Sequence, residues 1–274
     1  MRRSTVLWIL ALVLTLAAAV WQEVTGPTFP IRSRVGLGGQ LFPVKLVRSW
    51  STGDQPIELA ISDAAVHGRV RWRRYPTSEA WRVQPLQRSA DVLRASLPHQ
   101  PPAGKLEYQI ELARGDERVI LPDRPAVTRF KGEVPAGILV PHIFAMFLGM
   151  LFSARAGLEA IVKGSGRRWL ATVAFVLLLG GGFVLGPLVQ KAAFGAYWTG
   201  VPWGYDLTDN KTLIAVAAWA LVMWRLYRHP NAAAALGTPP TRPTARWSVV
   251  FAALVTLVVF AIPHSMWGSE IKWE

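Results

Sequence analysis

Five long apolar segments constrain this 274-residue chain more than any other feature of its sequence. They cover residues 5–21, 136–152, 169–189, 213–227 and 247–262. Each is nearly free of charge and has about the length that a helix needs to cross a bilayer. Only 17% of all residues are charged, which argues against an ordinary soluble enzyme. The sequence therefore predicts an α-helical membrane bundle of five spans, or of four if the first segment is removed.

The first apolar segment has two interpretations. Arg2 and Arg3 precede it, and an alanine run at 17–19 lies near its end. Basic residues, an apolar stretch and small residues in this order are typical of a cleaved signal peptide. The stretch also just reaches the length of about 17 residues at which a helix can span a membrane. Residues 1–21 are thus expected to be either a membrane anchor or a signal segment.

The basic residues predict how the spans are oriented, because Lys and Arg in short loops favour the cytoplasmic side. Ten of them would face the cytoplasm: Arg2, Arg3, Arg155, Lys163, Arg167, Arg168, Arg225, Arg228, Arg242 and Arg246. The opposite loops and tail hold Lys191, Lys211 and Lys272. We expect a multi-pass protein of the bacterial cytoplasmic (inner) membrane, with its N-terminus inside and its C-terminus outside. Much of the net charge of +13 is then a topology signal, and we expect no nucleic-acid partner.

Residues 22–135 follow another pattern, in which short alternating runs are separated by Gly, Pro and Asp. Examples are the runs 42–50, 56–62 and 105–112. Alternation with a period of two indicates strands with one buried face, and about seven such strands fit an antiparallel sandwich. The sequence predicts an inserted extracytoplasmic all-β domain with an immunoglobulin-like sandwich fold.

One predicted strand of this domain carries alternating arginines. Arg69, Arg71 and Arg73 would share one face of the strand, opposite Val70 and Trp72. Such a row is either a solvated surface or a basic face that binds a ligand or partner.

The remaining residues, 136–274, are expected to form a four-helix membrane domain with an aromatic loop at 190–212 on its outer face. The aromatic side chains of this loop are Tyr197, Trp198, Trp203 and Tyr205. Its helix-interrupting residues are Gly195, Gly200, Pro202 and Gly204, and candidate N-caps of the next helix are Asp206, Thr208, Asp209 and Asn210. Aromatic residues at helix ends often form a belt at lipid headgroups, so the loop is an interfacial belt, a binding site or both.

Two histidines lie on the same predicted membrane face as this loop. His142 follows Pro141 near the outer start of the second span, and His264 follows Pro263 at the outer end of the fifth. An ionisable side chain at membrane depth is a candidate functional residue, although an interfacial histidine can also simply reach water.

The segments 194–199, 203–208 and 211–214 resemble the tryptophan-rich WWD loop of the cytochrome c assembly family. Members of that family hold haem at the outer membrane face, with the loop against the macrocycle and a histidine on each side as axial ligand. The resemblance implies haem b as cofactor and His142 and His264 as iron ligands. The implied loop contacts are Gly195, Tyr197, Trp198, Trp203, Tyr205 and Asp206. The chain departs from the family in a Gly-Val-Pro insertion between its two tryptophans and in the strand-rich external domain.

These observations lead to a first functional hypothesis and two alternatives. The first is an integral membrane protein with an outer-face haem-binding or haem-handling site, active in cytochrome assembly. It would carry haem rather than turn over a substrate, because the sequence shows no general base or second redox group. An alternative is a non-enzymatic scaffold or assembly factor that docks an extracytoplasmic partner through its β domain and outer loop. A third is a metal site made of Asp206, Asp209 and a histidine.

Overall fold

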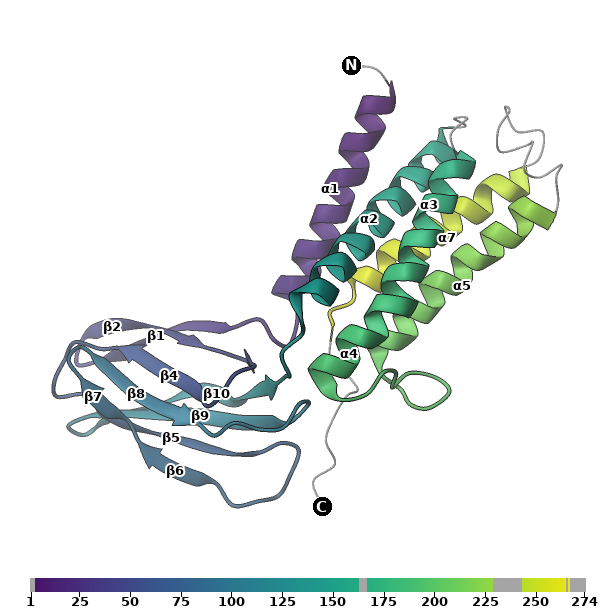
Figure 1. The fold of residues 1–274 in the computed structure, drawn as a ribbon. Helices are drawn as coiled ribbons and strands as arrows, with labels where there is room; N and C mark the ends of the chain where they lie inside the picture. The colour runs from purple at the N-terminus through teal and green to yellow at the C-terminus, as the bar shows by residue number, and fades with distance from the viewer. Residues whose placement is uncertain (1–2, 163–166, 229–242, 265, 267–274) are drawn as a thin grey trace. The chain divides into compact units, whose positions relative to one another are not determined.

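The chain folds into two compact units (Figure 1). The computed structural model describes residues 3–162, 167–228, 243–264 and 266. The β unit consists mainly of Pro27–Glu133. The helical unit is drawn from Met1–Gly26, Val134–Ala192 and Ala196–Gly268, so the β unit is inserted in the sequence between its first two helices.

The β unit contains ten described strands in three sheets. The strands are β1 (Ile31–Leu37), β2 (Gln40–Leu46), β3 (Ser49–Trp50), β4 (Gln55–Ala60), β5 (His67–Arg74), β6 (Arg82–Pro85), β7 (Gln87–Ser89), β8 (Val92–Leu97), β9 (Lys105–Arg114) and β10 (Glu117–Phe130). β1 pairs with β2, β3-β10-β9-β5-β6 form a five-stranded sheet, and β4-β8-β7 form a three-stranded one. All of these pairs are antiparallel except the parallel pair of β3 with β10.

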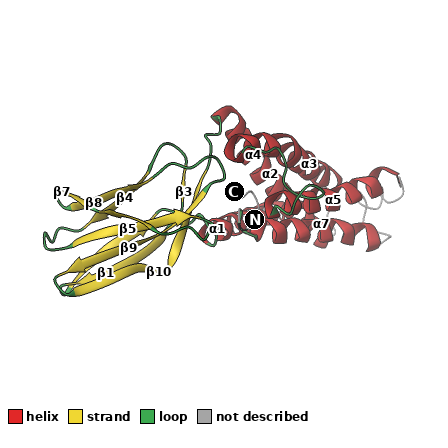
Figure 2. Ribbon diagram, turned by 90° about the horizontal axis from the view of Figure 1, so that it is seen from below, coloured by secondary structure: helices red, strands yellow, loops and turns green. Residues whose placement is uncertain are grey.

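Alternating side chains from all three sheets line one hydrophobic core in the β unit. Figure 2 shows the strands of this unit in yellow. In β4 every second residue is buried, and Ile57 and Leu59 enter this core. The centre of the core includes Tyr108, whose hydroxyl donates to the carbonyl of Val47 at 2.7 Å. That bond satisfies the polar end of a fully buried ring.

The predicted arginine row is present on β5. Val70 and Trp72 are buried, and the arginines lie on the other face of the strand opposite side chains of β9. The Nε of Arg69 is 2.5 Å from a carboxylate oxygen of Glu111. The remaining pairs are Arg73 with Glu107, at 2.5 Å, and Arg71 with Gln109 and Glu111. The row is therefore a partly exposed ladder whose charges are paired within the sheet.

The helical unit contains one long N-terminal helix and further helices that follow the β unit. They are α1 (Arg3–Val24), α2 (Ala136–Ile161), α3 (Arg167–Leu179), the π-helix η1 (Gly180–Leu185), α4 (Gly186–Phe194), α5 (Leu207–Arg228) and α7 (Pro243–Ala261). α3, η1 and α4 follow one another without a break. We call the end of this unit at which α1 and α7 finish and α2 and α5 begin the site end (Figure 1).

The predicted fold class is wrong in two respects. Within the described residues only three helices are long and apolar enough to cross a membrane, namely Arg3–Val24, Ala136–Ile161 and Arg168–Phe194. α5 carries Asp209 and Lys211 near its start, and the apolar part of α7 is shorter, Arg246–Ala261. The strands form three sheets rather than the two of an immunoglobulin-like sandwich. Alternation predicts which face of a strand is buried, but it does not predict which strands pair.

Small residues form much of the contact between the helices. Ala156 and Ala160 of α2 pack in a buried cluster with Ala171 and Ala174 of α3. A side chain at Gly157 would lie 2.6 Å from the Cβ of Ala253, so α2 and α7 approach closely at this point. Side chains of this size allow helix backbones to come together where apolar burial gives little driving force, as in a bilayer.

α1 packs into this unit along one stripe of its surface. The buried positions are Leu7, Ala11, Thr15 and Ala18, spaced three and four residues apart. Near its start, the ring of Trp8 lies 5.3 Å from that of Phe152 and faces the guanidinium of Arg155. The N-terminal segment, for which the sequence allowed an anchor or a signal peptide, is thus an integral element of the helical unit in this structure.

Candidate functional site

The loop between α4 and α5 is attached to the first turns of α5 by buried polar side chains. Oδ2 of Asp209 accepts hydrogen bonds from the backbone N–H of Thr199 at 2.6 Å and from Nε2 of Gln190 at 3.1 Å. Oδ1 of Asn210 accepts from the N–H of Val201 at 2.8 Å. Asp209 is 6% exposed, so its carboxylate is used inside the fold. These bonds fix the path of the loop over the end of α5.

Two glycines permit the close approach of loop and helix. A Cβ atom at Gly200 would lie 2.6 Å from the Cβ of Asp209 and 2.7 Å from Oδ1 of Asn210. A Cβ at Gly204 would overlap the carbonyl oxygen of Thr199. Real Cβ atoms do not approach other atoms so closely, and hence both positions require glycine in this conformation.

Two residues predicted to contact a haem are engaged within the protein instead. The ring of Trp198 lies 5.2 Å from that of Phe183, and its Nε1–H donates to the carbonyl of Val201 at 3.1 Å. Asp206 is the N-cap of α5, because Oδ1 accepts from the N–H of Thr208 at 2.7 Å and from that of the next residue at 3.2 Å. The prediction that they contact a cofactor is untested, but both side chains stabilise the loop and the start of α5.

The other predicted aromatic side chains of the loop point away from the protein interior. Tyr197 is 57% exposed, Trp203 81% and Tyr205 90%. The ammonium of Lys191 lies 5.4 Å from the centre of the Tyr197 ring, a cation–π distance. Gly195, also predicted for the site, has a φ of +87°, which favours glycine where the chain leaves α4. The loop thus presents three large aromatic surfaces on a braced backbone.

His142 lies at the site end, beside the π-helix η1. Its Nδ1 is 2.9 Å from the carbonyl oxygen of Gly181. A carbonyl only accepts hydrogen bonds, so Nδ1 carries a proton, and in the neutral imidazole Nε2 then keeps a lone pair. Histidines that bind metals commonly donate their other ring N–H to a backbone carbonyl in this way. π-helical turns, for their part, are frequent at functional sites.

Lys211 and His264 complete a polar group at the same end. Lys211 is 1% exposed, and its Nζ donates to the carbonyl of Ile262 at 2.7 Å. The ammonium also interacts electrostatically with Asp206. His264 interacts electrostatically with both Lys211 and His142. The site end therefore holds both predicted histidines together with a buried cation.

These residues fit a haem in part. His142 has the tautomer and the supported orientation of an iron ligand, and His264 is its electrostatic neighbour. The predicted loop surface fits less well, since Trp198 and Asp206 are occupied. Among the residues that the structure describes, no three His, Cys, Asp or Glu side chains group to hold a metal ion, so the third hypothesis of an Asp206–Asp209–histidine site gains no support.

Sequence reasoning did not recognise Lys211 as a site residue, because it counted this lysine as an external charge. The residue lies four positions before Ala215 and eight before Trp219, both fully buried. Positions at this spacing share one helix face, so the pattern places Lys211 on the buried stripe of α5. The spacing of Lys211 from these two apolar residues was the sequence signal that could have predicted its burial.

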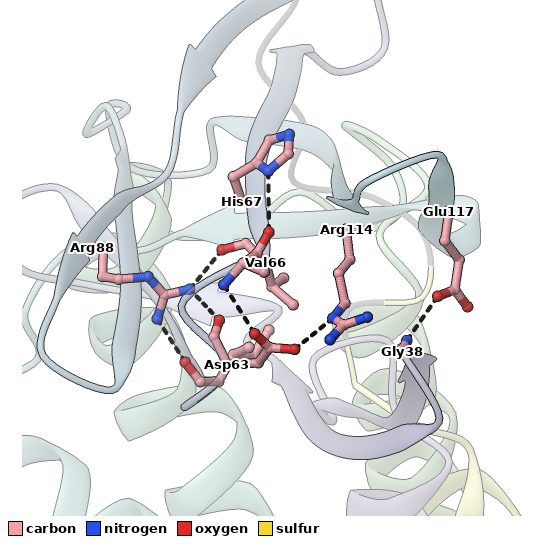
Figure 3. Close-up of polar contacts among 9 residues, drawn as sticks. Gly38, Asp63, Val66, His67, Arg88, Arg114 and Glu117 are labelled. Atoms are coloured by element: carbon pink, nitrogen blue, oxygen red, sulfur yellow. Dashed lines mark hydrogen bonds and ion pairs between the residues drawn. The ribbon is translucent and has the colours of Figure 1, made fainter.

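In the β unit, polar contacts gather around the turn after β4, but they brace the fold rather than form an open site (Figure 3). The guanidinium of Arg88 donates to the carbonyls of Ile61, Asp63 and Val66 at 2.7, 2.9 and 2.6 Å. The carboxylate of Asp63 accepts from Arg114 at 2.6 Å. The pKa of this carboxyl is lowered, first by the N–H of Ala65 and then by Arg114.

Comparison with known proteins adds no further assignment. No known protein family, no curated protein and no solved structure matches this chain. The candidate site therefore rests on its own geometry.

Proposed function

We propose that this chain is an integral membrane protein that binds haem b at the site end of its helical unit, with His142 and His264 as the axial ligands. The observation that carries the proposal is the state of His142, whose Nδ1–H is held by Gly181 while Nε2 keeps its lone pair. His264 supports it as a second imidazole within electrostatic range. Two neutral imidazoles are a suitable axial pair for haem iron.

Membrane insertion is supported by the large apolar side chains that the helical unit exposes on its surface. On α1 the buried positions are mostly small or polar, whereas Leu10, Val13 and Leu16 are 45%, 55% and 45% exposed. α7 exposes a stripe of large apolar side chains: Trp247, Phe251, Leu254 and Val258. A soluble bundle buries such residues, but a bundle in lipid can expose them. This exposure supports the proposed location in the bacterial inner membrane.

The chain's own residues would bind and orient the cofactor. The flat side chains of Tyr197, Trp203 and Tyr205 can cover a porphyrin, and Gly181 orients the ring of His142. A bound haem would supply an iron that changes oxidation state. Because the chain has no cysteine, it would hold haem without thioether bonds and could release it to an acceptor, which suits a haem carrier in cytochrome assembly.

Absorption spectroscopy of the purified full chain tests this proposal. After haem is added and the excess removed, we expect a Soret band typical of a six-coordinate, low-spin haem. His142→Ala and His264→Ala should each abolish or strongly shift that band. His67→Ala, which changes an exposed histidine of β5, is the matched control and should leave the band unchanged. A wild-type chain without a Soret band, or one insensitive to both site substitutions, would contradict the proposal.

A second candidate function is the docking of an extracytoplasmic protein partner without any cofactor. It is favoured by the exposure of Trp203 and Tyr205 on a loop whose backbone is held by Asp209 and Asn210. Rigid, exposed aromatic side chains are frequent anchors of protein interfaces. Here Trp203→Ala should release the partner in a pull-down, whereas His142→Ala and His264→Ala should leave the partner bound. Retention of the partner after this substitution and after deletion of residues 27–133 would speak against docking.

A further inference from the structure

The last turn of α7 is capped by side chains from two other helices. A helix leaves its final carbonyl groups without partners in its own backbone. Nε2 of Gln22, on α1, donates to the carbonyls of Phe260 and Ile262 at 2.8 and 3.0 Å. Nζ of Lys211, on α5, donates to the same carbonyl of Ile262 at 2.7 Å. Three side-chain hydrogen bonds thus converge on two carbonyl groups at the end of α7, one of Phe260 and one of Ile262.

The sequence explains why this cap comes from elsewhere. A helix usually ends with backbone N–H groups of the next residues bonded to its last carbonyls. The residue after Ile262 is Pro263, which has no N–H to donate. Pro263 is buried, and a Cβ atom at Gly26 would lie 3.8 Å from the Cβ of Pro263. The turn after α7 is therefore also packed against the residues that follow α1. Donors on other helices supply the bonds that the local backbone lacks.

His264 lies just beyond this cap in the chain. His264 follows Pro263, whose ring restricts the backbone. It is two residues from Ile262, whose carbonyl accepts two side-chain hydrogen bonds. Lys211 is 1% exposed, and a buried ammonium is costly unless its bonds and a counter-charge compensate it. Asp206, at the start of α5, supplies the counter-charge. The hydrogen bond to Ile262 and the charge of Asp206 therefore compensate the burial of the Lys211 ammonium.

We infer that Gln22 and Lys211 are positioning residues, which hold the segment after α7 so that His264 keeps its place at the site end, where His142 also lies. The purpose of this arrangement rests on the proposed function, in which both imidazoles bind one iron. The arrangement itself does not depend on haem and can be tested without it.

The absence of cysteine makes the direct test a distance measurement by electron paramagnetic resonance. Spin labels are attached to the full chain carrying His142→Cys and His264→Cys. We expect one narrow distance distribution in this background. Gln22→Met and Lys211→Met should each broaden it by about twofold, because the end of α7 then opens locally. Lys191→Met, which removes an exposed lysine of α4, is the control and should leave the width unchanged.

Two outcomes separate this inference from the haem proposal. In chains that keep both histidines, Lys211→Met should convert part of the haem from low to high spin, because His264 no longer stays in place. If wild type binds no haem, the proposed function fails while the distance result still decides the inference. Gln22→Met is the safer variant for folding, since Gln22 is only half-buried and methionine has a similar length. If the width of the distance distribution were unchanged in both Gln22→Met and Lys211→Met, the positioning role of these two residues would be overturned.

Discussion

At the residue scale, buried polar groups of the helical unit are satisfied by specific partners on other helices. Trp219 of α5 is fully buried, and its Nε1–H donates to Oγ1 of Thr256 on α7 at 2.9 Å. The hydroxyl of Thr256 in turn donates to the carbonyl of Ala252. An indole in an apolar interior requires such a partner, so this bond fixes the register of α5 against α7.

Thr256→Val should destabilise the protein, because it leaves the buried indole N–H of Trp219 without an acceptor at nearly unchanged volume. The expected loss is about 1 to 3 kcal/mol of the free energy of unfolding. Thr15→Val is the matched control, since Thr15 is equally buried and its hydroxyl bonds only Ala11 of its own helix. Its effect should stay within about 0.5 kcal/mol. Unfolding in denaturant with detergent measures both, and equal losses would refute this role of Thr256.

A second residue-scale prediction concerns acid stability of the β unit. The pKa of Asp63 is lowered in the folded chain, chiefly by the N–H of Ala65 and then by Arg114. A carboxyl with a lowered folded pKa stabilises the fold fully above its unfolded pKa of about 3.9 and stops doing so as pH falls through the folded value. Asp63→Asn should therefore be less stable than wild type at neutral pH, and the difference should disappear in acid.

Melting temperatures of wild type and Asp63→Asn across a pH series provide the measurement. Asp116→Asn, in the exposed turn between β9 and β10, serves as control for the loss of one surface charge. A gap between wild type and Asp63→Asn that stays constant down to strongly acidic pH would contradict the prediction.

At the element scale, the aromatic loop depends on backbone approach more than on its aromatic side chains. Gly200→Ala would place a methyl group against Asp209 and Asn210, the two residues that bind the loop to α5. We expect overpacking to destabilise the loop by about 1 to 3 kcal/mol. Hydrogen exchange of the Thr199 and Val201 amides should become faster. Gly137→Ala, in the open first turn of α2, should leave that exchange unchanged, and slow exchange in both variants would argue against a tight loop.

The sequence predicted elements better than their partners. Alternation predicted the strand that became β4, and apolar length predicted α1, α2 and the span Arg168–Phe194. It did not predict that β3 lies parallel to β10, because that pairing joins Ser49 to Arg129 across the chain. The site follows the same rule. His142 and His264 were recognisable as residues, but the bond from Lys211 to Ile262 spans 51 positions and depends on how α5 and α7 pack.

At the scale of the whole molecule, the sequence order of the units makes a topology testable. The β unit lies in the chain between α1 and α2, so two spanning helices at these positions would leave it on the side where α1 ends and α2 begins. The basic residues at the opposite helix ends, among them Arg3 and Arg168, would place those ends in the cytoplasm under the positive-inside rule. The β unit and the site end would then both face outward.

Labelling of single cysteines in intact bacterial cells measures this topology, because the natural chain contributes no thiol background. A membrane-impermeant maleimide should label Gln87→Cys, on the exposed strand β7, and Trp203→Cys, in the aromatic loop, in intact cells. Ile161→Cys, at the far end of α2 and 50% exposed, should react only after the membrane is permeabilised. The reverse labelling pattern would mean that the topology is inverted and that the two histidines face the cytoplasm. Labelling of all three sites in intact cells would instead mean that α2 does not cross the membrane.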